Sequence, residues 1–232
     1  MLRVAARPSA SQLSAHAECH TQIETPEEHV RRIWRNADAV AFDVDSTVCQ
    51  DEAIDEFANF LGVGEAVANV TRQAMNGNAR FRVRMVYGLQ QLTPGIRELV
   101  AALHKRGTDV FLVSGGFRRL IRPVADILGI DKSRIYANEI LFDRNKNYAG
   151  FDETEPTSDS GSKDVGKPAV MGLLKKQGYK QLVMVGDGAT DLEAAPPADA
   201  FIGFGGNQVR EAVRSRADWY VTDFDVLRKA LE

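Results

Sequence analysis

The sequence contains few of the residues from which histidine- or cysteine-based sites are built. Its 232 residues include two cysteines, Cys19 and Cys49, and four histidines, three of them at or before His29. The cysteines form no cluster with metal-ligand spacing, and we expect no structural disulfide, as in a reducing intracellular compartment. A nuclease or protease site built on histidine is therefore not expected.

Long apolar runs and an excess of positive charge are also missing. No stretch approaches the roughly 18 apolar residues that would suggest a membrane span. The formal net charge is −3, whereas nucleic-acid-binding proteins normally carry a basic excess. We therefore expect a globular protein with a small-molecule partner, without a membrane or nucleic-acid partner. Homodimer formation is left open.

The first 25 residues have a composition of their own. They contain Arg3 and Arg7, several Ser and Ala, and one acid, Glu18. This balance is typical of a disordered extension and is also compatible with an organelle transit peptide, but the apolar core of a secretory signal is missing. The first interpretation predicts a cytoplasmic protein and the second an organellar one.

Short apolar strands alternate with amphipathic helices along most of the chain. The run 39–42 is continuously apolar, which is typical of a strand buried on both faces of a parallel sheet. Further strands are expected at 109–116, 181–188, 200–204 and 219–222, and a hairpin at 139–153. Helices are expected at 26–36, 93–107, 117–130, 167–178, 190–197, 208–217 and from Phe224 onward. This order predicts an α/β fold, doubly wound around a mostly parallel sheet.

Three of the expected strands end in polar loops, which read DVDST, SGG and GDGATD. In parallel sheets, ligands bind beyond the carboxyl ends of the strands. Asp43 and Asp45 turn to the same side of an extended segment, and Asp187 adds a further carboxylate. Mg²⁺ prefers oxygen ligands and would relieve the repulsion among these groups. Asp191, one helical turn further on, would orient the ion through bound water.

This set of groups suits phosphoryl transfer. With a metal neutralising charge, Asp43 can attack phosphorus and form an acyl phosphate. Asp45 can protonate the leaving alkoxide and later deprotonate the attacking water. Ser114 and the backbone N–H groups of Gly115 and Gly116 would bind phosphoryl oxygens. A lysine from a nearby polar loop would offset the charge that develops in the transition state.

Each motif alone also has an ordinary structural explanation. A D-x-D pair occurs in turns and calcium loops, SGG is a common turn, and GDGATD could be a helix N-cap with a tight turn. Here all three occur in one chain, each directly after an apolar strand. That combination favours one shared catalytic site.

The motifs resemble those of the haloacid dehalogenase superfamily of phosphatases, and within it the phosphoserine branch. The similar segments include FDVDST, LTPGIREL, VSGGF, GDGATDLEA and FIGFGGN, and the resemblance covers residues 36–232. It implies a Rossmann-like core at 26–50 and 93–232, with a small helical cap at 51–92 inserted after the first strand. It also implies magnesium-dependent hydrolysis of O-phospho-L-serine to L-serine and phosphate, the last step of serine synthesis, through an aspartyl phosphate.

The resemblance also implies residue roles. Asp43 would be the nucleophile and Asp45 the acid/base, with the Asp45 backbone carbonyl on magnesium. Asp43 and Asp187 would be the carboxylate ligands, supported by Asp191. The implied substrate contacts are Glu52 to the ammonium group, Met75 and Phe81 around the serine end, and Ser114, Gly115 and Thr190. The catalytic lysine would be Lys167, with Lys163 as the alternative.

The expected cap departs from the family pattern. Only RVRMVYGLQQ separates Phe81 from LTPGIREL, and Gly88 stands where the family has an arginine that binds the substrate carboxylate. Losing that guanidinium removes a strong charge-assisted contact, and a shorter cap excludes water less well. Two alternatives follow: a phosphatase or phosphotransferase of altered or broad specificity, and a catalytically impaired chain that acts as a binding partner.

Overall fold

A six-stranded parallel sheet lies at the centre of the protein. The computed structural model describes residues 24–50, 91–144, 148–158 and 165–232. The strand order is β3-β2-β1-β6-β7-β8, and all neighbouring strands pair in parallel. The strands are β1 (Ala39–Phe42), β2 (Asp109–Phe117), β3 (Ile135–Asn138), β6 (Leu182–Gly186), β7 (Ala200–Phe204) and β8 (Trp219–Val221). The predicted α/β fold is therefore confirmed, while the expectations for 1–23 and 51–90 lie outside the described residues.

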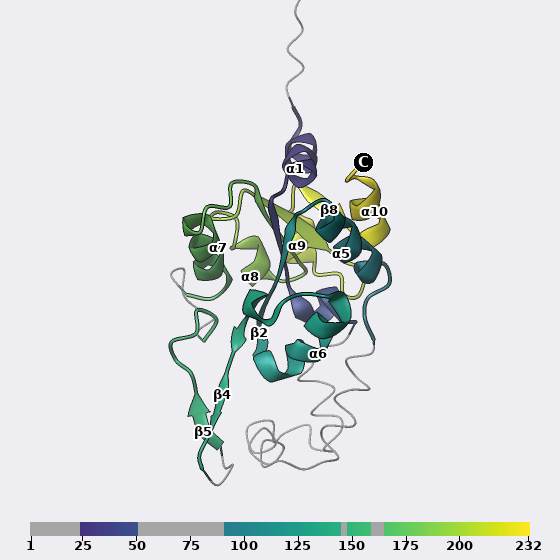
Figure 1. Ribbon diagram of the computed structural model, residues 1–232. Coiled ribbons are helices and arrows are strands. Elements are labelled where there is room, and N and C mark those ends of the chain that lie inside the picture. Colours follow the sequence, from purple (N-terminus) through teal and green to yellow (C-terminus); the bar gives the residue numbers. More distant parts are fainter. Residues whose placement is uncertain (1–23, 51–90, 145–147, 159–164) are drawn as a thin grey trace, which may run out of the picture.

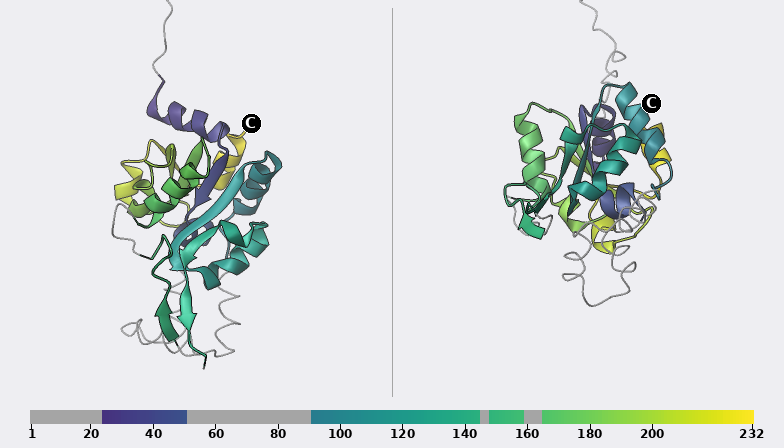
Figure 2. Two further views of the ribbon diagram at one scale, coloured as in Figure 1. Left: turned by 60° about the vertical axis from the view of Figure 1, so that its left-hand side comes forward. Right: turned by 60° about the horizontal axis from the view of Figure 1, so that its bottom comes forward.

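Helices cover both faces of the sheet (Figure 1, Figure 2). One face carries α1 (Pro26–Arg35), α5 (Ile96–Lys105), α6 (Arg118–Leu128) and α10 (Phe224–Lys229). The other carries α7 (Lys167–Lys176), α8 (Ala189–Leu192) and α9 (Glu211–Arg214). Val40 and Phe42 of β1 pack into the first layer, and Ala39 and Ala41 into the second. This alternation explains why the central strand is apolar at every position.

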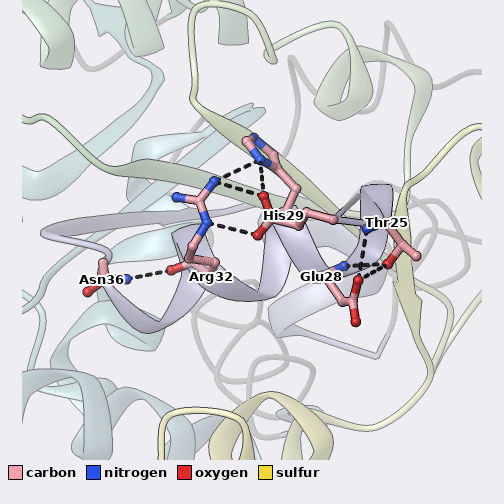
Figure 3. A network of polar contacts seen from close by, with 6 residues as sticks. Thr25, Glu28, His29, Arg32 and Asn36 are labelled. Carbon is pink, nitrogen blue, oxygen red and sulfur yellow. Dashed lines mark hydrogen bonds and ion pairs between the residues drawn. The ribbon is translucent and has the colours of Figure 1, made fainter. Parts of the chain in front are cut away.

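The first helix begins where its sequence predicts. Thr25 caps it, since its hydroxyl accepts a hydrogen bond from the Glu28 N–H at 3.2 Å and its own N–H donates to the Glu28 carboxylate at 2.8 Å (Figure 3). Pro26 occupies the first helical position, where no N–H is needed. On the inner side, the buried Trp34 donates from its indole to the Leu227 carbonyl at 3.0 Å. The helix is thereby fastened to α10.

Several elements differ from their predicted extent. Strand β3 was not predicted, because its alternation of buried Ile135 and Ala137 with half-buried neighbours is short and lies at the sheet edge. Helices α8 and α9 each have four residues, fewer than their patterns indicate. The expected hairpin is present as β4 (Ile140–Phe142) and β5 (Tyr148–Phe151). None of the helices in the described parts of the chain has the length and apolar character that a bilayer crossing requires.

The two ends of the segment 51–90 leave the core side by side. Gln50 donates from its backbone N–H to the Gln91 carbonyl at 3.1 Å, and Thr93 donates in the same way to Val48 at 2.9 Å. Cys49, a buried thiol, pairs with Leu92 in an antiparallel bridge. The core is thus closed on itself at the point where this segment begins and ends.

Aromatic stacking under β7 provides a test of the packing. The Phe224 ring is fully buried and stacks on Phe204 with ring centroids 4.2 Å apart. Phe224→Ala would leave a cavity that these rigid neighbours cannot fill, and we expect it to lower the free energy of unfolding by about 3–5 kcal/mol. Urea denaturation measures the change. Val226→Ala on the same helix is the control, because Val226 is 41% exposed, and an equal loss for both variants would contradict the prediction.

Candidate active site

Three polar segments meet at the carboxyl ends of the central strands. Strands β2, β1 and β6 are adjacent. Ser114 lies near the end of β2, Asp43 directly follows β1 and Asp187 directly follows β6. Because parallel strands deliver their carboxyl ends to one edge, these side chains come together although they are far apart in the sequence. The structure thus brings together the described members of the predicted site, apart from Thr190, which lies half-buried in α8 with no contact to the group among the described interactions.

The loop after β1 makes a wide turn that two side chains hold in place. Asp43 is extended, the turn spans Val44–Val48, and Ser46 adopts a left-handed conformation with φ of 56°. The amide of Asn207 donates to the Ser46 carbonyl at 3.1 Å and to the Thr93 hydroxyl at 2.7 Å. This support keeps the turn fixed despite the unfavourable backbone conformation of Ser46.

Three buried carboxylates lie close together, and one lysine contacts two of them. Oxygens of Asp43, Asp187 and Asp191 lie within 4.8 Å of one another. Lys167, the first residue of α7, donates to Asp43 Oδ1 at 2.6 Å and also to Asp191 Oδ1. Asp191 is oriented further by the Gly188 N–H, which donates to its other oxygen at 2.9 Å. Lys167 therefore links the residue that follows β1 to helix α8.

Burial and mutual repulsion shift the pKa values in this group. Burial raises the pKa of Asp43 well above its usual range, Asp191 raises it further, and Lys167 opposes both effects. Burial likewise raises the pKa of Asp191 against the opposing charge of Lys167. For Lys167, burial alone lowers the pKa, but Asp191 and Asp43 outweigh it and the pKa of Lys167 is raised. Burial thus disfavours the ionised forms of Asp43 and Asp191, while Lys167 favours them.

The donor set fits a divalent cation that prefers oxygen. Asp43, Asp187 and Asp191 offer converging carboxylate oxygens, and hard cations such as Mg²⁺ are bound by such groups. Asp187 is held from two sides, since Thr47 donates to Oδ1 at 3.2 Å and Arg210 to Oδ2 at 2.8 Å. A cation among these oxygens would stabilise all of them in the ionised form.

The C-terminal part of β2 places a serine against Asp45. Ser114 is fully buried, and its hydroxyl donates to Asp45 Oδ2 at 3.3 Å while accepting from the Gly116 N–H at 2.8 Å. A Cβ atom at Gly116 would lie 3.1 Å from the Ser114 hydroxyl oxygen and 3.4 Å from Asp45 Oδ2. A side chain at position 116 would therefore press on Ser114 and Asp45, whereas a Cβ at Gly115 would meet nothing within 4 Å.

Some residues of the prediction lie outside the described chain, and others were missed. Glu52, Met75, Phe81 and the alternative lysine Lys163 are outside the described residues, as is Gly88. Arg210 and Asn207 contact the site but were not predicted. Asn207 belongs to the segment FIGFGGN that carries the family resemblance, so a signal for it existed. Arg210 was assigned to a helix over 208–217, and nothing in the neighbouring sequence indicates an ion pair with Asp187.

Comparisons with known proteins agree with this geometry. A family model described as haloacid dehalogenase-like hydrolase matches residues 37–199. Phosphoserine phosphatase of Bos taurus is 50% identical over 222 residues, which are 88% of this chain and 97% of the relative. The chloroplastic phosphoserine phosphatase of Arabidopsis thaliana is 45% identical over 227 residues, 89% of this chain and 76% of the relative. A solved phospho-aspartyl intermediate analogue of phosphoserine phosphatase is similar with a TM-score of 0.60 at 25% identity, covering 84% of this chain and 99% of that one.

The close approach of the three carboxylates predicts that magnesium binding stabilises the folded protein. A cation that binds only the folded protein raises its stability with concentration, by about 2.7 kcal/mol at a hundredfold excess over the dissociation constant. We expect Mg²⁺ to raise the thermal midpoint of the wild type and to have little effect on Asp187→Asn, measured by differential scanning fluorimetry. Asp218→Asn, at an exposed position, should respond like the wild type. Equal shifts in all three proteins would show that the ion binds elsewhere.

Proposed function

The chain belongs to the haloacid dehalogenase-like hydrolases and, within them, to the phosphoserine phosphatases, and we propose that Asp43, Asp45 and Lys167 carry its hydrolysis of O-phospho-L-serine to L-serine and phosphate. The observation that supports these roles is the buried contact of Lys167 with Asp43 and Asp191, next to Asp187. The Ser114 hydroxyl donates a hydrogen bond to Asp45. The product serves L-serine biosynthesis.

Asp43 acts as the nucleophile in the first half of the reaction. One of its carboxylate oxygens forms a bond to phosphorus while the bond from phosphorus to the serine oxygen breaks, which gives an aspartyl phosphate. Asp45 gives its proton to the departing serine oxygen, because an alkoxide is otherwise a poor leaving group. Serine leaves as the neutral alcohol, and Asp45 is left ionised.

Water completes the reaction in the second half. The ionised Asp45 takes a proton from water, whose oxygen attacks phosphorus and displaces Asp43. Phosphate is released, and both carboxyl groups return to their starting states. Bound magnesium supplies charge neutralisation for the attack of one anion on another, and Asp43, Asp187, the Asp45 carbonyl and the supporting Asp191 are the residues that would hold it.

Phosphoryl oxygens are bound by the segment Ser114–Gly116 of β2 and by Lys167. The Ser114 hydroxyl and the Gly115 N–H are the proposed donors, as backbone amides are in other anion sites. The Gly116 N–H, also predicted as a donor, donates instead to the Ser114 hydroxyl oxygen. Thr190 is proposed as a further contact. Lys167 offsets charge in the transition state and also keeps Asp43 in place for attack.

The serine end is assigned to residues of the segment 51–92, the proposed cap. Glu52 would pair with the ammonium group, and Met75 and Phe81 would line the rest. Gly88, in the position where the family carries an arginine, favours a second candidate: a phosphatase that accepts small phosphomonoesters lacking a carboxylate. Arg82 and Arg84 are alternative partners for the substrate carboxylate.

Location and assembly remain proposals. The Arabidopsis thaliana relative is named as chloroplastic, which supports the transit-peptide interpretation of residues 1–25. A cytoplasmic protein with a disordered extension is the other interpretation, and fluorescence microscopy of the full chain fused to a reporter would separate them. A homodimer is proposed as the assembly.

Substitution of the proposed nucleophile tests the mechanism. Asp43→Asn keeps the shape but cannot form the acyl phosphate, and we expect kcat for phosphoserine to fall by roughly four orders of magnitude or more. Magnesium-dependent phosphate release measures this, with Asp218→Asn as the control. Hydroxylamine should also trap an acyl phosphate at Asp43 in the wild type. An unchanged kcat in Asp43→Asn would show that Asp43 is not the nucleophile.

A pair of substrates separates the two specificity candidates. Phosphoethanolamine lacks the carboxylate of phosphoserine and keeps the ammonium and phosphate groups. If the carboxylate is bound by a charge-assisted hydrogen bond worth about 1.5–3 kcal/mol, kcat/KM for phosphoserine should exceed that for phosphoethanolamine by roughly 10- to 100-fold. Equal values would instead identify a phosphatase of broad specificity.

A further inference from the structure

The SGG loop lies in a bulge of the sheet. Strands β2 and β3 pair Val113 with Tyr136 and then Phe117 with Asn138. Three residues of β2, the loop Ser114–Gly116, therefore face the single residue Ala137 of β3. A bulge interrupts the ladder of hydrogen bonds and leaves backbone groups that need other partners. Bulges of this kind commonly re-aim side chains beside active sites.

The side chain of Asn138 supplies one of those partners. Its Nδ2 donates to the Gly115 carbonyl at 2.7 Å, while its Oδ1 accepts from the Thr157 hydroxyl at 3.1 Å. Thr157 is only 2% exposed, so the hydroxyl end of this contact is buried. Since a carbonyl can only accept, the NH₂ end of the amide must face Gly115.

The Gly115 carbonyl is linked rigidly to the serine hydroxyl. The Gly115 C=O and the Gly116 N–H belong to one planar peptide, so fixing the first fixes the direction of the second. The Gly116 N–H donates to the Ser114 hydroxyl oxygen, which in turn donates to Asp45. Asn138 is therefore connected through one peptide plane to the proposed acid/base, without touching it.

The same contact reaches the lysine from the other direction. Thr157 follows Pro156, whose carbonyl accepts from the Gly166 N–H at 2.6 Å, and Gly166 directly precedes Lys167. The hairpin projects beyond the end of β2 (Figure 1, Figure 2). The residues at its base, Asn138 and Thr157, thus lie between the segment Ser114–Gly116 and the start of α7. Both elements are proposed to bind the same phosphoryl group.

Arg118 fastens this region to the sheet. Its guanidinium donates to the Ala137 carbonyl at 3.2 Å and pairs with Glu139 at 3.1 Å and with Glu155. Glu139 precedes the hairpin and Glu155 follows it. One side chain therefore ties β3 and the segment that carries Thr157 to the beginning of α6, so that Asn138 has a rigid base.

We propose that Asn138 is a positioning residue for phosphoryl transfer, which sets the Ser114 hydroxyl against Asp45 by fixing the Gly115–Gly116 peptide. Thr157 holds the Asn138 amide in the required orientation. The inference rests on the proposed function, since it assigns Ser114 and Asp45 to that reaction. It concerns geometry during the chemical step more than the affinity for the serine end of the substrate.

Substitutions at the two positions test this role in the full-length, magnesium-loaded enzyme. Asn138→Ala removes both contacts, and Asn138→Asp places an oxygen against the Gly115 carbonyl. We expect kcat for phosphoserine to fall about 10- to 100-fold, since small displacements of reacting groups cost this much, with KM rising by a smaller factor. Thr157→Val should lower kcat by a smaller factor, and Thr157→Ser, which keeps the hydroxyl, should restore it. Asn36→Ala, a surface asparagine at the end of α1, is the control.

Binding of inorganic phosphate separates this inference from the proposed function. Calorimetry in Mg²⁺ should show weaker phosphate binding in Asn138→Ala than in Asn36→Ala, whether or not phosphoserine is hydrolysed. A wild type that does not hydrolyse phosphoserine would overturn the proposed function, and the binding comparison would still decide the role of Asn138. Unchanged kcat and phosphate affinity in both Asn138 variants would overturn the positioning role, as would a lowered thermal midpoint with kcat unchanged.

Discussion

The concentration of negative charge at one edge of the sheet is the constraint on which the rest of the structure depends. Asp43, Asp187 and Asp191 are buried within a few ångströms of one another, with Lys167 between two of them. Such an arrangement is costly unless every charge is held and compensated. The parallel strands deliver the carboxylates, α7 delivers the lysine at its first residue, and two apolar layers keep these elements from moving apart.

The sequence allowed the fold and the carboxylates to be predicted because both have local signals. The apolar run 39–42 followed by Asp43 marks a buried strand and its end, and GDGATD does the same for Asp187. The contact of Arg210 with Asp187, 23 positions away, had no such signal. Asn207 lies in the segment FIGFGGN, but nothing local links it to the turn 161 positions away that it contacts. Strand β3 was missed because its four alternating residues become a strand only by pairing with β2.

Loops from four parts of the chain support one another around the site. Asn207, which follows β7, holds the turn after β1, and Thr93 donates to the Thr47 carbonyl of the same turn at 2.6 Å. In the same way, the Asn138 amide donates to the Gly115 carbonyl in the bulged part of β2. In each case an amide or hydroxyl side chain satisfies backbone carbonyls that the sheet leaves unpaired. The polar groups around the carboxylates are thus fixed by residues that do not react.

Because Gln50 and Gln91 are hydrogen-bonded to each other, the core can accept a different sequence between them. Since those ends already meet in the folded core, doubling the length of chain between them costs only about 0.6 kcal/mol of loop-closure entropy. Selection or a protein engineer could exchange that segment, or trim it, with little penalty to the Rossmann-like domain. Since the segment 51–92 is proposed to bind the serine end of the substrate, substrate range can then evolve separately from the residues that break the phosphate ester.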